Sequence, residues 1–121
     1  MRLIIPHELT DLNTYINAER SNKYAAAAIK ERDTNTAWLY SKRQKNENSN
    51  GRYRITFHWY CKDKRKDPDN IAFARKFILD GMVKAGVLKN DGWNNVASLS
   101  DEFYIDKEKP RIEVQLVESE G

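Results

Sequence analysis

The chain has 121 residues, of which 40% are hydrophobic and 32% charged, and this length suits one domain over residues 1–121 and excludes two. Its single cysteine, Cys61, excludes an intrachain disulfide and a zinc site built from cysteines. The net charge of +3 is a small excess of cations. The sequence has no long apolar segment of the kind found in signal peptides or membrane spans, so we expect a cytoplasmic protein.

The first half of the chain predicts a strand, a helical region and a second strand. Residues 2–6 are typical of a short strand ended by proline, and residues 11–43 are mostly helical. The pattern leaves open whether this region is one helix or two, with Ser21 as a candidate cap for the second. After a polar loop at 44–51, residues 52–61 alternate as in a strand with one buried face. That face contains Tyr53, Ile55, Phe57 and Trp59.

The second half of the chain predicts a helix and two more strands. Asp67 and Pro68 are typical of a helix start, because aspartate caps the first turn and proline needs no N–H partner there. The helix is expected to continue up to Gly86, which ends it. Residues 96–105 and 111–117 alternate as strands, and the short segment between them predicts a hairpin loop. This order of elements indicates an α+β fold, with helices packed against a small mixed sheet.

Three aspartates around the predicted helix are candidate metal ligands. Asp67 and Asp69 lie at its start, and Asp91 lies in a turn just beyond its end. Hard ions such as Mg²⁺ and Mn²⁺ prefer oxygen ligands, so three carboxylates brought together would suit one or two such ions. The plainer interpretation is that Asp67 caps the helix and Asp69 complements its dipole.

Two clusters of cations favour a polyanionic partner. They are Lys62, Lys64, Arg65 and Lys66, and Lys42, Arg43 and Lys45. Such runs can also be no more than a solvated face. The first cluster, however, leads directly into Asp67, and cations beside a carboxylate pair are what a nucleic-acid backbone reacting at a metal requires. We therefore expect both clusters to bind DNA.

Lys76 is the candidate catalytic cation of the helix. It follows Asp69 by seven residues, about two turns, and its side chain would lean back toward the helix start. The alternative is a surface ion pair with Asp80, four residues later. Arg75 is the competing cation, and it is also a candidate for DNA binding.

The histidines, Trp93 and Cys61 are weaker candidates. His7 and His58 are potential ligands, although His58 lies on the polar side of its strand and is expected to face solvent or DNA. Trp93 is expected to be exposed, either against bases at a branch point or in a dimer contact, and the sequence leaves these alternatives open. Cys61 is expected to be a small buried residue and not a nucleophile.

A series of motifs from residue 52 onward resembles a known family of nucleases. The motifs are Lys66-Asp67-Pro68-Asp69-Asn70, the step from Lys76 to Asp80, Lys84-Ala85-Gly86-Val87, and Asn90-Asp91. Together they resemble the RusA-type Holliday junction resolvases, a family with many phage-encoded members. The resemblance implies a homodimeric, Mg²⁺-dependent endodeoxyribonuclease of a bacterium or phage. Such an enzyme resolves four-way junctions by paired nicks in recombination and repair. It also implies that Asp67, Asp69 and Asp91 bind the metal.

The chain departs from the family pattern at two positions. The family's essential lysine usually comes four residues after the second aspartate of the motif, where this chain has Phe73. Counting back from Asp80 assigns that role to Lys76 instead. Asn90 stands where the family often has an aspartate, which weakens one potential ligand to an amide. Two alternatives stay open: a DNA-binding module that has lost catalysis, and a nuclease that acts on other branched DNA.

Overall fold

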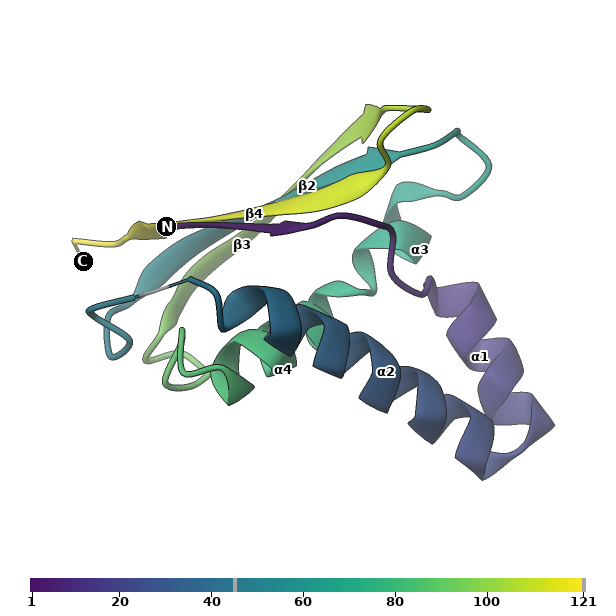
Figure 1. Cartoon of the computed structure of the whole chain (residues 1–121), viewed down its shortest axis with the longest axis horizontal. Coiled ribbons are helices and arrows are strands. Elements are labelled where there is room, and N and C mark those ends of the chain that lie inside the picture. The colour runs from purple at the N-terminus through teal and green to yellow at the C-terminus, as the bar shows by residue number, and fades with distance from the viewer. Residues whose placement is uncertain (45, 121) are drawn as a thin grey trace.

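A four-stranded mixed sheet forms the frame of the protein, in a computed structural model that describes residues 1–44 and 46–120. Its strands are β1 (Arg2–Ile5), β2 (Tyr53–Cys61), β3 (Val96–Ile105) and β4 (Arg111–Glu118). The strand order is β1-β4-β2-β3, with β2 parallel to β3 and the other neighbours antiparallel. In the described part of the chain the helices lie on one side of this sheet (Figure 1). The expected α+β architecture is therefore confirmed.

The buried face of β2 is the one that its alternation predicts. Tyr53, Ile55, Phe57 and Trp59 are buried. The register of β2 with β4 continues this layer into Ile112, Val114 and Leu116, which are also buried. Because burying one such side chain contributes roughly 1.5–3 kcal/mol, this apolar layer between sheet and helices supplies much of the stability.

Two separately capped helices follow β1. Asp11 caps α1 (Leu12–Ser21), and Asn22 caps α2 (Lys23–Ser41), each through a side-chain oxygen that accepts backbone N–H groups of the first turn. The region left open as one helix or two is thus two helices. The predicted cap at Ser21 is wrong, because Ser21 is the last residue of α1 and the cap function falls to Asn22. Among the helices that the structure describes, none has the length and apolar character to cross a membrane.

The single helix predicted after β2 is two helices, α3 (Pro68–Ala72) and α4 (Arg75–Lys84). Between them, the N–H groups of Ala74 and Lys76 donate to carbonyls three residues back, at 3.3 Å each. Such bonds tighten the chain into a turn narrower than an α-helix. Lys76 therefore does not lie two regular turns above Asp69, and the prediction of a continuous helix is wrong.

The predicted hairpin between the last two strands is also wrong. β4 lies between β1 and β2, so the connection from β3 joins strands that are not neighbours. β3 instead runs parallel to β2, and the intervening α3 and α4 form the crossover that parallel strands need. The physical reason lies in burial: β4 places Ile112, Val114 and Leu116 in the core, whereas most of β3 stays exposed at the sheet edge.

A close contact at Gly81 fixes α4 against α2. A Cβ atom at Gly81 would lie 2.5 Å from the Cβ of Ala37 and 2.7 Å from the backbone nitrogen of Trp38. Only glycine permits this approach without a shift of one helix. Gly86, with φ of 78°, follows the helix and ends it as predicted. The position of α4, and of the cations at its start, is therefore set by packing on α2.

Candidate functional site

Asp67 and Asp69 lie at the start of α3, directly after the basic loop that follows β2. Asp67 occupies the N-cap position with an extended backbone, but its side chain makes no capping hydrogen bond. The Oδ1 of Asp69 accepts the backbone N–H of Asn70 at 3.0 Å. Both aspartates are exposed. The interpretation of Asp67 as a capping side chain is thus incorrect, although its position in the helix is the predicted one.

The start of α3 is held against α1 by Asn70. This side chain is 9% exposed, and its Oδ1 accepts the backbone N–H of Asn13 at 2.8 Å. The contact anchors the same turn that carries Asp69. Asn70 belongs to the Asp-x-Asp-Asn motif, but reasoning from the sequence gives it no role, because its partner lies 57 residues away in the chain.

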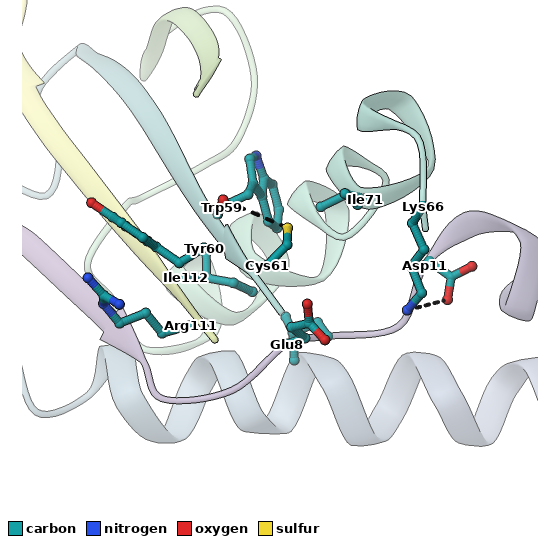
Figure 2. Close-up of a pocket in the computed structure, with 10 residues that line it drawn as sticks. Glu8, Asp11, Trp59, Tyr60, Cys61, Lys66, Ile71, Arg111 and Ile112 are labelled. Atoms are coloured by element: carbon teal, nitrogen blue, oxygen red, sulfur yellow. Dashed lines mark hydrogen bonds and ion pairs between the residues drawn. The ribbon is translucent and has the colours of Figure 1, made fainter. Parts of the chain in front are cut away.

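A second tie joins the basic loop to α1. The Nζ of Lys66 lies 3.2 Å from Oδ1 of Asp11, as Figure 2 shows at the side of a pocket that Cys61 and Ile71 also line. Burial of Asp11 raises its pKa, but hydrogen bonds from Thr14 and the charge of Lys66 outweigh burial and lower the pKa to about 2. Asp11 is therefore ionised at neutral pH, with Lys66 as its counter-ion. Lys66 was expected to bind DNA, and in this structure it has an internal partner.

Lys76 contacts one of the candidate aspartates. Its ammonium lies 3.1 Å from the carboxylate of Asp80, the ion pair foreseen as an alternative, and 3.7 Å from that of Asp91. The hydrogen bond to Asp80 and the charge of Asp91 raise the pKa of Lys76 against the effect of its partial burial, so the ammonium stays protonated. The side chain thus points toward the turn of Asp91. The prediction that it leans back toward the start of the helix is wrong.

Arg75, the competing cation, is held by a different carboxylate. Its Nη1 lies 3.0 Å from Oδ2 of Asp101 on β3, and Oδ1 of Asp101 accepts the indole N–H of Trp59 at 2.9 Å. Asp101 thereby joins the start of α4 to the sheet. Of the two neighbouring cations, Arg75 is engaged with the sheet and Lys76 faces Asp91.

The three candidate metal ligands come from two segments of the crossover, and Asp91 contacts Lys76 near the start of α4. Asp67 and Asp69 lie at the start of α3, whereas Asp91 follows the end of α4. Within residues 1–44 and 46–120, no group of three or more histidine, cysteine, aspartate or glutamate side chains is arranged to hold an ion. Proteins usually bind Mg²⁺ through one or two carboxylates together with water and substrate phosphate. The exposed pair Asp67 and Asp69 fits that donor set by its chemistry, and the role of all three as ligands stays a prediction.

The loop before Asp67 carries two exposed lysines, Lys62 and Lys64. Arg65, in the same loop, lies 3.7 Å from the carboxylate of Asp63. Lys64 and Asp67 line a surface hollow whose other side is the end of β3. Positive side chains and a carboxylate of the motif therefore border one depression.

The second basic cluster lies at the end of α2. The ammonium of Lys42 lies 4.4 Å from the ring centre of Trp38, and the guanidinium of Arg43 lies 5.0 Å from that of Tyr40. Both cations are exposed. Lys45 lies outside the described residues. DNA binding by this cluster stays a prediction.

The structure also locates the weaker candidates. Cys61 is 6% exposed and burial raises the pKa of its thiol, which confirms a small buried residue. His58 stacks on Tyr104, with 3.1 Å between its Nδ1 and the phenol oxygen. His7 is exposed and lies 2.9 Å, through Nδ1, from the carbonyl oxygen of Glu8. Trp93 is 88% exposed, as its position in the turn predicts.

A carboxylate pair at a helix start, beside a basic loop on a small α+β domain, is the chemistry of a metal-dependent nuclease. The chain matches the family model of the endodeoxyribonuclease RusA over residues 4–117, and no match to a curated protein was found. Because the family match spans nearly the whole chain, the chain belongs to the RusA endodeoxyribonuclease family. The protein is thus a Holliday junction endodeoxyribonuclease of a metal-dependent family, with branched DNA as its substrate and recombination as its process. The resemblance drawn from the motifs is confirmed.

Proposed function

We propose that this RusA-family protein resolves four-way DNA junctions by Mg²⁺-dependent hydrolysis, with Asp67, Asp69 and Asp91 as metal ligands and Mn²⁺ as an alternative ion. The observation that carries the proposal is the Asp67 side chain. An aspartate at an N-cap normally accepts an N–H of the first turn, yet this carboxylate makes no such bond. Its oxygens and those of the exposed Asp69 offer the hard donors that Mg²⁺ prefers.

The chain's own groups have distinct tasks in this reaction. A bound divalent ion would polarise the scissile phosphate and lower the pKa of a coordinated water. Lys76, kept protonated by Asp80 and Asp91, offsets negative charge that develops on the phosphate. Asn70 holds the helix start that carries Asp69 through its bond to the backbone of Asn13.

Lys76 is proposed as the catalytic cation, and Arg75 as a cation that supports the fold and the DNA. The distinction rests on partners, because Arg75 is paired with Asp101 while Lys76 lies beside Asp91. Replacing Lys76 with alanine is expected to lower the cleavage rate by about 10²- to 10³-fold, the usual cost of removing one group that stabilises transition-state charge. Arg75→Lys, which keeps the charge, is the matched control and is expected to retain cleavage.

Two copies of the chain are proposed to act together. A four-way junction presents two strands related by a near two-fold axis, and a symmetric dimer would present one site to each. This arrangement accounts for paired nicks. The expected place of action is the cytoplasm of a bacterium, either for its own DNA or for that of a phage. Sedimentation with and without junction DNA measures the number of copies.

The test of the metal site is cleavage of a synthetic four-way junction with and without Mg²⁺. Wild type is expected to nick opposed strands only with the ion, and Asp69→Asn and Asp91→Asn are expected to lose nicking while they still bind the junction. Asp63→Asn is a matched control, because this aspartate lies in the same loop but pairs with Arg65. Nicking by Asp69→Asn at the wild-type rate would overturn the assignment. Flaps and forks in the same assay separate a junction resolvase from a nuclease of other branched DNA.

A further inference from the structure

We propose that Trp93 stacks on a base exposed at the branch point and so gives the protein its preference for branched over duplex DNA. The inference rests on the proposed junction cleavage and adds a specificity-determining residue to it. Trp93 follows Asp91 after a single glycine. Its side chain, at 88%, is the most exposed large hydrophobic one in the described part of the chain.

Exposure by itself does not mark a binding residue, because isolated aromatic side chains on a surface are common. Tyr24, at the start of α2, is also 73% exposed, and the ammonium of Lys23 lies 5.2 Å from its ring centre, but none of the three candidate metal ligands is near it in the chain. Trp93 differs in the support of its backbone and in its place beside a candidate ligand, and cations contact its turn as well. These three features carry the inference together.

The backbone beneath Trp93 is held by hydrogen bonds. The carbonyl of Gly92 accepts the N–H groups of Asn95 and Val96, at 3.1 and 3.0 Å. The side chain of Asn95 is buried and donates to the carbonyls of Asn50 and Gly51, at 3.1 and 2.9 Å. An aromatic ring presented from a fixed turn loses little conformational freedom when it binds, which favours binding through that ring.

Two cations contact the same turn, and a third precedes it in the chain. Arg52 donates through Nε to the carbonyl oxygen of Trp93 at 3.2 Å. Lys89 lies exposed four residues before Trp93, and Lys76 contacts Asp91. Proteins that bind unpaired nucleotides combine an aromatic ring, on which a base stacks, with cations that contact the phosphates. These charges complement phosphates better than an apolar protein surface, and lysine in particular is depleted in protein interfaces.

The position of Trp93 also explains why such a contact would select branched DNA. Bases in an intact duplex are stacked on their neighbours, and exposing one costs a few kcal/mol, whereas this cost is smaller where pairing is already disturbed. Because one glycine separates Trp93 from Asp91, a strand whose base stacks on the indole would pass the candidate metal ligand. Binding at Trp93 would thus select the branch and place its phosphate near the site.

The test compares binding of a four-way junction with binding of a duplex of the same sequence, without divalent metal. Trp93→Ala is expected to weaken junction binding about tenfold, equal to about 1.4 kcal/mol, which lies in the range found for removing one base-stacking ring. Duplex binding is expected to change less than twofold. Trp93→Phe is expected to keep most of the junction preference, and Tyr24→Ala is the control for loss of an exposed ring away from the site.

The outcomes separate this inference from the proposed cleavage. If Trp93→Ala keeps the wild-type ratio of junction to duplex affinity, the inference fails, even where wild type nicks the junction with Mg²⁺. If the ratio falls as expected but no metal-dependent nicking is found, the inference stands and the proposed chemistry fails. A shift of Trp93→Ala toward monomer in sedimentation, with an unchanged affinity ratio, would assign the indole to a second copy and overturn the inference.

Discussion

Replacing Asp11 with asparagine is expected to remove a pH-dependent part of the stability. The pKa of Asp11 is lowered from 3.8 to about 2, because hydrogen bonds from Thr14 and the charge of Lys66 outweigh the effect of burial. One pKa unit corresponds to about 1.36 kcal/mol, so the ionised carboxylate contributes roughly 2 kcal/mol to the free energy of unfolding. The side chain is only 8% exposed, and solvent screening reduces this contribution little.

The sign of the effect follows from the lowered pKa. Above about pH 5 the carboxylate is ionised in both the folded and the unfolded chain, and its full contribution is present. As the pH falls below 3.8 the unfolded chain takes up a proton first, so the contribution declines and is lost as the pH passes through about 2. Asparagine is also a good N-cap residue, so Asp11→Asn keeps the cap of α1 and removes mainly the charge.

The measurement is urea unfolding of wild type and Asp11→Asn at a series of pH values from 7 to 2. The difference in free energy of unfolding between the two proteins is expected to stay constant down to about pH 5 and then to shrink by roughly 2 kcal/mol toward pH 2. Other carboxylates titrate in both proteins and cancel in this difference. A difference that does not change between pH 7 and pH 2 would refute the pairing of Asp11 with Lys66 and Thr14 as the source of the low pKa.

Four further outcomes follow from packing and charge. Gly81→Ala is expected to lower the free energy of unfolding by roughly 1–3 kcal/mol in urea melts, because its new Cβ would meet the backbone of α2. Gly86→Ala is expected to cost about 1 kcal/mol in the same melts, from its positive φ alone. No loss of stability in Gly81→Ala would contradict the close approach of the helices. Exchange of both Lys62 and Lys64 for glutamine is expected to reduce the slope of log K against log salt for junction binding by about 2. Lys66→Gln is expected to leave that slope nearly unchanged, since Lys66 already has Asp11 as a partner.

Local patterns predicted several parts of the fold because neighbouring residues determine them. Alternation in β2 identifies its buried face, since successive side chains of a strand point to opposite sides. The start of α3 at Asp67 and the end of α4 at Gly86 follow from residue types with strong positional preferences. The break between α3 and α4 was missed, because Ala74 and Lys76 are ordinary helix residues and only their hydrogen bonds reveal the turn.

Sequence alone placed Asp67, Asp69 and the basic loop next to one another, since these residues are neighbours in the chain, and its motifs identified the family. Tertiary structure decided which contacts the charged groups make: Lys66 with Asp11, Arg75 with Asp101, and Lys76 with Asp91. It also placed β4 inside the sheet and β3 at its edge. The reason is the same in each case. These contacts join segments that are not neighbours in the chain. Burial and the packing of whole helices and strands determine which segments meet, and a local sequence pattern does not contain that information.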